Sequence, residues 1–176
     1  MSDRLFFALW PDPALLQALR ARVDKVTASV GGKPQRPDQW HVTLEFLGQV
    51  PRERLPALRA AADRVSRSPV TIEFDRVEHW RKPQVVCLVA SRVPTGLAAL
   101  VTQLRAELAT EGFAIESRPF RPHVTLARKV RSAAGTRLEP PFLWQTKGFA
   151  LVRSVTDPAG SRYEPLDWWN HAVEGG

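Results

Sequence analysis

The tetrapeptide His-Val-Thr-Leu occurs twice in this chain, at residues 41–44 and 123–126, and both copies lie among strand-forming residues. Side chains alternate between the two faces of a β-strand, so the histidine and threonine of each copy are expected on one face and the valine and leucine on the other. If the two halves of the chain pack about a pseudo-two-fold axis, two His/Thr pairs face each other across one cleft.

The rest of the sequence predicts an α+β arrangement, in the order strand, helix, strand, helix, two strands, helix and three strands. Apolar runs predict strands, and apolar residues at helical spacing predict helices. The first helix is expected to begin at Asp12 as N-cap, with Pro13 at its first position, and to end at Gly31-Gly32. Further helices are expected at 52–67 and 96–112, and a loop near 132–141. Besides the two His-Val-Thr-Leu segments, strands are expected at 4–10, 70–80, 84–91, 147–155 and 162–169.

Composition limits the class of protein. The 176 residues are 44% hydrophobic, enough to bury a core, and no linker or low-complexity tract divides them. We therefore expect a single bilobal domain over 1–176. The net charge of +7 is mostly due to arginine and favours anionic partners such as nucleic acid or nucleotides. No stretch is long enough for a membrane span, and the first apolar stretch is too short for a signal peptide, so a cytoplasmic protein without a membrane partner is expected.

Two opposed histidines suit in-line displacement at phosphorus. The reaction needs a base on the attacking oxygen and an acid on the leaving oxygen, and histidine titrates near neutrality. Threonine hydroxyls can hold the phosphate oxygens and an arginine can stabilise the developing charge. Nothing in this scheme needs a metal or a cofactor, and the single Cys87 excludes a thiolate zinc cluster. His79 and His171 have no counterparts and are expected to be structural and solvent-exposed, respectively.

With its flanks, the double motif resembles the two-histidine (2H) phosphoesterase superfamily, and more closely its bacterial RNA 2′,3′-cyclic phosphodiesterase branch, also named 2′-5′ RNA ligases. The resemblance covers nearly the whole chain, through "RLFFALWP", "HVTLEFLG", "RPFRPHVTLAR" and "SRYEPL". It implies an α+β fold of two pseudo-symmetric lobes. Each lobe would be an antiparallel sheet with helices outside, and the lobes would flank a central cleft that contains both His-Val-Thr-Leu strands.

The resemblance also implies an activity, hydrolysis of a terminal 2′,3′-cyclic phosphate on RNA to a 2′-phosphate, without metal or cofactor. By that analogy His123 is the general base and His41 the general acid. Thr43 and Thr125 would hold phosphate oxygens, and Arg128 would contact the phosphate. The expected partner is an RNA or oligonucleotide with a 2′,3′-cyclic phosphate end, and the chain is expected to be a monomer.

Some side chains fit this scheme less simply. Strict alternation from His123 places Arg128 on the opposite face, so the strand must twist, bulge or end before it. Alternation also places Glu45 on the His41 face, where it could raise the pKa of that histidine, repel a phosphate, or lie at the rim and do neither. Four aromatic residues are candidates for holding the base or ribose, or else belong to the core: Phe7, Trp10, Phe120 and Tyr163.

Three other functions stay open from the sequence. The same fold could join RNA ends by ATP-independent 2′-5′ ligation, the reverse type of reaction. It could be a non-catalytic module that binds RNA or nucleotides, although both His/Thr pairs are present. It could also be a histidine-based metal hydrolase, which sensitivity to EDTA would reveal.

Overall fold

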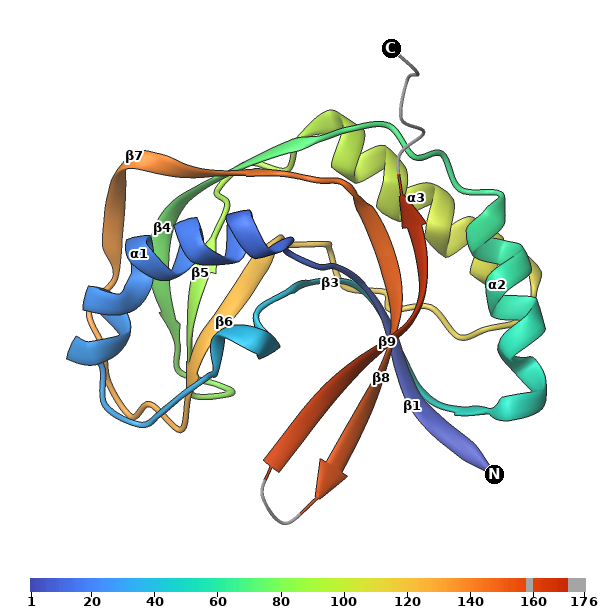
Figure 1. Ribbon diagram of the computed structural model, residues 1–176, viewed down its shortest axis with the longest axis horizontal. Helices are drawn as coiled ribbons and strands as arrows, with labels where there is room; N and C mark the ends of the chain where they lie inside the picture. The colour runs from blue at the N-terminus through green and yellow to red at the C-terminus, as the bar shows by residue number, and fades with distance from the viewer. Residues whose placement is uncertain (158–159, 171–176) are drawn as a thin grey trace.

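The computed structural model describes residues 1–157 and 160–170, with the side chain of residue 157 left out, and its strands form two antiparallel sheets (Figure 1). His171 therefore lies outside the described residues. The four-stranded sheet has the order β3-β1-β8-β9, and the five-stranded sheet has the order β2-β6-β5-β4-β7. The strands of the first are β1 (Ser2–Leu9), β3 (Val42–Pro51), β8 (Gly148–Asp157) and β9 (Gly160–Asn170). Those of the second are β2 (Lys33–Pro34), β4 (Thr71–Trp80), β5 (Val85–Val89), β6 (His123–Arg128) and β7 (Thr136–Gln145).

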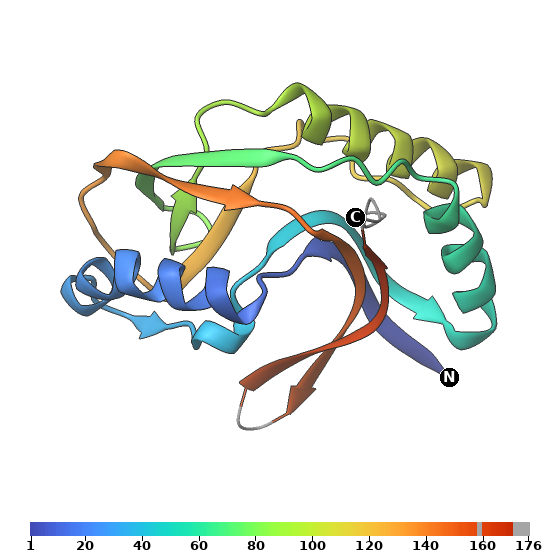
Figure 2. The ribbon, with the colours of Figure 1, turned by 45° about the horizontal axis from the view of Figure 1, so that its top comes forward.

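The helices lie on the outer sides of this pair of sheets (Figure 2). They are α1 (Pro13–Ser29), α2 (Leu55–Asp63) and α3 (Thr95–Thr110), with 3-10 turns η1 (Pro37–Gln39) and η2 (Arg52–Arg54). α1 contacts β7, whereas α2 lies beside α3, which contacts β3. α1 thus packs on the five-stranded sheet, and α3 packs on the four-stranded sheet with α2 beside it.

The start of α1 is the predicted one. The Asp12 carboxylate accepts a hydrogen bond from the backbone N–H of Leu15 at 2.8 Å, and Pro13 follows the cap. Proline costs nothing there because the first helical N–H has no intrahelical acceptor.

The central strands of both sheets are apolar on both faces. In β1, Leu5 and Phe7 enter a core that is shared by both sheets and all three helices, whereas Phe6 and Ala8 form a smaller cluster with β8. β5 repeats this arrangement, because alternate residues enter the shared core and the others, including Cys87, form a third cluster. Both smaller clusters lie on the sheet faces that carry the histidines. Continuous apolar runs in "RLFFAL" and "VVCLV" follow from this double burial.

The predicted fold class, α+β with two antiparallel sheets, is confirmed. The loop predicted near 132–141 is wrong over most of its length, because β7 begins at Thr136. Pro140 and Pro141 hide the strand pattern in the sequence, and the register against β4 shifts across them. β7 tolerates the prolines because it is an edge strand with only one neighbour.

The two-residue strand β2 was not predicted, and it depends on Gly32. Gly32 has φ +92°, and a Cβ atom there would lie 2.5 Å from the Arg128 carbonyl oxygen and 2.9 Å from that of Lys129. The chain can therefore approach the end of β6 only where a side chain is missing.

We expect Gly32→Ala to lower the free energy of unfolding by about 2 kcal/mol or more, from the positive φ and the close backbone approach. Gly31→Ala is the matched control, because nothing lies within 4 Å of a Cβ at Gly31. Urea unfolding of both variants checks this, and equal midpoints for the two would contradict it.

Candidate active site

A β-bulge interrupts each His-Val-Thr-Leu strand at its leucine. The pairing of β3 with β1 passes from Ala8–Thr43 to Phe7–Glu45 and leaves Leu44 unpaired. The pairing of β6 with β5 passes from Cys87–Thr125 to Val86–Ala127 and leaves Leu126 unpaired. One extra residue reverses the alternation of the side chains that directly follow it.

The bulge in β6 is the irregularity that the position of Arg128 required. It returns Arg128 to the face of His123 and Thr125, and Arg128 lines a recess together with His41 and Thr43. The corresponding residue after the first bulge is Phe46, which lines the same recess and is 44% exposed. The cleft therefore receives three residues from each motif strand: His41, Thr43 and Phe46 from one, and His123, Thr125 and Arg128 from the other.

The bulge in β3 removes Glu45 from the His41 face, so its predicted position is wrong. Glu45 is only 2% exposed. Its carboxylate accepts hydrogen bonds from Arg105 Nε at 2.6 Å and from the backbone N–H of Glu116 at 2.7 Å. Glu45 thus ties β3 to α3 and to the segment that follows it, and this charge is already paired.

Both histidines are held by the same backbone contact. His41 Nδ1 lies 2.7 Å from the Gln39 carbonyl oxygen, and His123 Nδ1 lies 2.9 Å from the Arg121 carbonyl oxygen. A carbonyl oxygen can only accept, so each Nδ1 carries a proton and donates it. Each Nε2 is then the nitrogen available for chemistry, and His41 Nε2 lies 3.2 Å from the Thr43 hydroxyl.

Burial lowers the pKa of both imidazoles. For His41, burial outweighs the Gln39 hydrogen bond, and the charges of His123 and Arg128 add to the effect, which brings the pKa to about 4. For His123, burial lowers the pKa, the Arg121 carbonyl opposes this, and the charges of Arg121 and Arg128 lower it further. Arg128 is thus within electrostatic reach of both rings, and both are neutral at pH 7 in the free protein.

The aromatic candidates divide between the cleft and the core. The Trp10 ring stacks on His41 with centroids 5.3 Å apart and planes 4° apart, and Tyr163 meets the same imidazole edge-on at 5.0 Å. Phe7 is fully buried against Phe149 and Trp169, so of its two predicted alternatives the core position is the one observed. Its neighbour Phe6, with its centroid 5.0 Å from that of His41, faces the cleft instead.

A second recess opens beside His123, which we call the aromatic recess. Phe120 lines it, and so do Trp80, Phe46 and Thr43. Trp80 was missed from the sequence, and its ring centroid lies 4.7 Å from that of His123. His79, on the same strand, bonds through Nε2 to the Val130 carbonyl oxygen at 2.9 Å, in keeping with the structural role predicted for it.

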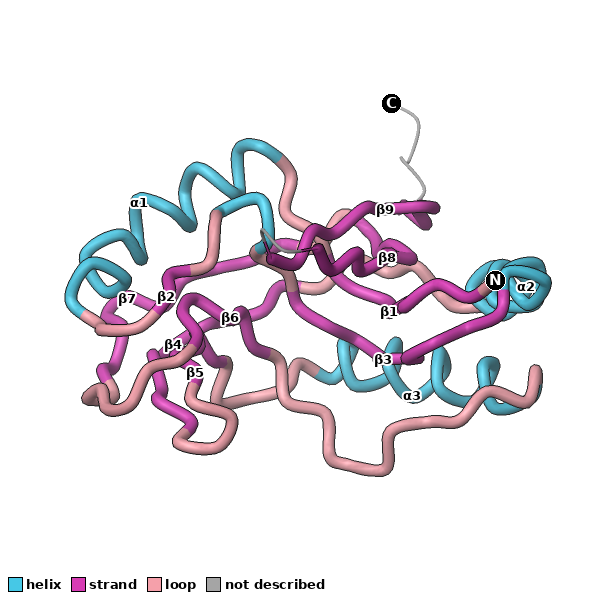
Figure 3. Tube along the Cα trace, turned by 90° about the horizontal axis from the view of Figure 1, so that it is seen from below, coloured by secondary structure: helices cyan, strands magenta, loops and turns pink. Residues whose placement is uncertain are grey.

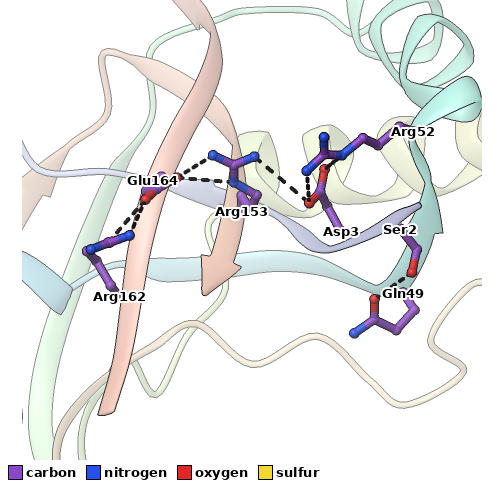
Figure 4. A network of polar contacts seen from close by, with 7 residues as sticks. All are labelled: Ser2, Asp3, Gln49, Arg52, Arg153, Arg162 and Glu164. Carbon is purple, nitrogen blue, oxygen red and sulfur yellow. Dashed lines mark hydrogen bonds and ion pairs between the residues drawn. The ribbon is translucent and has the colours of Figure 1, made fainter. Parts of the chain in front are cut away.

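A network of ion pairs holds the β8–β9 hairpin that carries Tyr163 (Figure 4). Glu164 accepts from Arg153 at 2.6 Å and from Arg162 at 2.9 Å, and Asp3 pairs with Arg52 at 2.9 Å and with Arg153 at 3.9 Å. These partly exposed pairs are each weak, but together they join β1, η2, β8 and β9. Tyr163 is thereby kept against His41.

Among residues 1–157 and 160–170, no group of three or more His, Cys, Asp or Glu side chains is placed to hold a metal ion. None of the helices described has the length and apolar composition required to cross a membrane.

Comparisons of the sequence and of the fold with known proteins agree on one family. The family described as LigT-like phosphoesterase matches residues 9–87 and 89–163, and each segment contains one His-Val-Thr-Leu. The RNA 2′,3′-cyclic phosphodiesterase of Escherichia coli (strain K12) is 35% identical over 170 residues, covering 95% of this chain and 96% of its own. The protein of the same name from Thermus thermophilus is 35% identical over 179 residues, covering 93% and 88%. The crystal structure of E. coli LigT complexed with 3′-AMP superimposes with a TM-score of 0.85 at 29% identity, covering 98% of this chain and all of that one.

The lowered pKa of His41 has a consequence for stability. Between pH 6.5 and about 4 the unfolded chain binds a proton at this residue and the folded protein does not. Stability is therefore greatest above pH 6.5 and falls as the pH drops toward 4. We expect His41 to contribute about 2 kcal/mol to the loss of unfolding free energy between about pH 7 and about pH 4.5.

Urea unfolding at these two pH values checks this prediction. Carboxylates and His123 also lower stability in acid, so the comparison is with His41→Phe, which keeps an aromatic ring but cannot titrate. A smaller loss in this variant than in the wild type is expected, and an equal loss would show that His41 titrates normally in the folded protein.

Proposed function

This chain belongs to the LigT-like phosphoesterase family, and from that premise we propose that it hydrolyses terminal 2′,3′-cyclic phosphates of RNA to 2′-phosphomonoesters. The names of its relatives from E. coli and T. thermophilus support this substrate. The observation that carries the mechanism is the matched pair of imidazoles, each with Nδ1 tied to a backbone carbonyl and Nε2 left for proton transfer.

The reaction that suits this pair is in-line attack of water on the cyclic phosphorus. His123 Nε2 takes the proton from the attacking water, and the new P–O bond forms as the bond from phosphorus to the ribose 3′ oxygen breaks. His41 Nε2 gives its proton to that departing oxygen, which leaves the phosphate on the 2′ oxygen. The assignment of acid and base follows the family resemblance, and the pair works in either direction by microscopic reversibility.

A bound phosphate supplies the charge that the acid role needs. Burial keeps His41 neutral in the free protein, so protonation before catalysis requires a nearby anion. The cyclic phosphodiester is that anion, and the stacked Trp10 ring further favours the imidazolium by a cation–π interaction. The hydroxyls of Thr43 and Thr125 would hold the non-bridging oxygens, and Arg128 would stabilise the charge that develops on them.

The first test is hydrolysis of an RNA oligonucleotide that ends in a 2′,3′-cyclic phosphate, with EDTA present. We expect a 2′-phosphate product from the wild type, because the proposed acid and base are side chains and no metal is needed. Loss of general acid–base catalysis predicts a rate roughly 10²- to 10⁴-fold lower in His41→Ala and in His123→Ala.

The same assay distinguishes the other functions. The wild type should give a bell-shaped dependence of kcat on pH, and each histidine variant should lose one limb. A rate abolished by EDTA would indicate a metal hydrolase. Binding of the RNA without turnover would indicate a binding module, and joined 2′-5′ products as the main outcome would indicate a ligase.

A second prediction concerns Arg128. We expect Arg128→Ala to lower kcat/KM roughly 100-fold, the usual cost of removing one donor to the transition-state charge. Arg128→Lys should recover only part of this loss, because an ammonium lacks the planar fork of guanidinium. Arg20→Ala is the matched control, since Arg20 is an exposed arginine of α1 paired with Asp24. Unchanged kinetics in Arg128→Ala would transfer the role to another arginine of the cleft.

A further inference from the structure

Two recesses beside the catalytic cleft differ in charge: the aromatic recess next to His123, and a recess next to Arg128. In the aromatic recess each lining arginine has a carboxylate partner: Arg105 pairs with Glu45, Arg118 with Glu116 and Arg121 with Glu78. The aromatic side chains beside these neutralised pairs offer flat apolar faces. Such a surface suits an uncharged planar group rather than a phosphate.

The recess next to Arg128, which we call the basic recess, is separate from the aromatic recess. Its cationic side chains are Lys33, Arg36, Arg128 and Lys129. Arg36 is paired with Asp38 at 3.0 Å. Within the described part of the chain, no carboxylate lies within ion-pairing distance of the other three. Arg128 also lines the His41 recess, so the basic recess and the catalytic cleft adjoin at this residue.

The backbone concentrates these charges on one face. Lys33 is the direct partner of Arg128 in the ladder between β2 and β6, so their side chains point to the same face of the sheet. Figure 3 shows β2 beside β6 at this point. Lys129 has φ +57°, outside the regular strand geometry, and it lines the same recess as its neighbour Arg128.

This arrangement is costly without an anion. Like charges directly opposite each other in an antiparallel pair are destabilising, and a left-handed backbone at a lysine adds strain. A phosphate seated between Lys33, Arg128 and Lys129 would offset the repulsion with charge-assisted hydrogen bonds.

We propose that the basic recess binds the internal phosphodiester next to the terminal cyclic nucleotide. The inference rests on the proposed function and specifies its substrate: an oligonucleotide with at least one internal phosphate rather than a mononucleotide 2′,3′-cyclic phosphate. The protein would then bind two successive phosphates of the RNA. The cyclic phosphate would lie between the histidines, and the internal phosphodiester next to it would lie in the basic recess.

The test compares three substrates. They are adenosine 2′,3′-cyclic phosphate, the diadenosine dinucleotide that ends in the same group, and that dinucleotide with an uncharged methylphosphonate link. For one charge-assisted phosphate contact we expect kcat/KM to be roughly tenfold higher for the natural dinucleotide than for the other two.

The variants remove the recess charges without touching the catalytic residues. Lys33→Ala combined with Lys129→Asn should abolish most of the preference for the dinucleotide and leave the mononucleotide rate unchanged. Asparagine is chosen at 129 because it tolerates the left-handed backbone. Lys25→Ala, an exposed lysine of α1, is the control for net charge and should keep the full preference.

Equal kcat/KM for the three wild-type reactions would overturn the proposal. So would an equal effect of the double variant on mononucleotide and dinucleotide, which would indicate general electrostatic attraction.

Calorimetric binding of the dinucleotide and mononucleotide 2′-phosphates tests the recess apart from turnover. If the wild type hydrolyses none of the substrates, the proposed function fails. The assignment of the basic recess still stands in that case if the double variant loses affinity for the dinucleotide 2′-phosphate but not for the mononucleotide 2′-phosphate. Equal affinities would overturn the assignment.

Discussion

A β-bulge at the leucine of each His-Val-Thr-Leu strand decides which side chains meet in the cleft. Without the bulges, Glu45 would face His41, and Arg128 would point into the core. With them, a carboxylate that would repel a phosphate is buried against Arg105, and a guanidinium enters the cleft. The unpaired leucine of each motif reverses the side-chain alternation directly after it, so the chemistry of the site depends on these two local irregularities.

The two histidines lie on sheet faces that are apolar beneath them. This placement explains why β1 and β5 carry hydrophobic residues on both faces, and it also depresses the pKa of each imidazole. The carbonyl that holds each Nδ1–H favours the protonated ring, but burial outweighs it. The imidazoles of the free site are therefore neutral, whereas Arg128 and the lysines next to it are cationic. In the proposed reaction an anionic substrate would complete the charge balance, and its binding and the protonation of His41 would then occur together.

Several features could be predicted because they are local. The cap at Asp12 needs only a carboxylate before a helical run, and the shared face of His and Thr needs only strand alternation. The predictions for Glu45 and for the segment that forms β7 were wrong, and the sequence left Phe7 open between cleft and core, because all three depend on partners elsewhere in the chain. Phe7 packs on Trp169, Glu45 follows a bulge set by pairing with β1, and the prolines of β7 are tolerated only at a sheet edge.

The sequence by itself determined the fold class, the family and the two His/Thr pairs, because periodicity and the repeated motif are written along the chain. Only the tertiary structure decided how Arg128 reaches the histidine face of the sheet, how Trp80 and Phe6 contact the imidazoles, and that Lys33 lies opposite Arg128. The physical reason is register. A bulge or a cross-strand pair is a relation between residues far apart in sequence, and its energy appears only when both strands are in place.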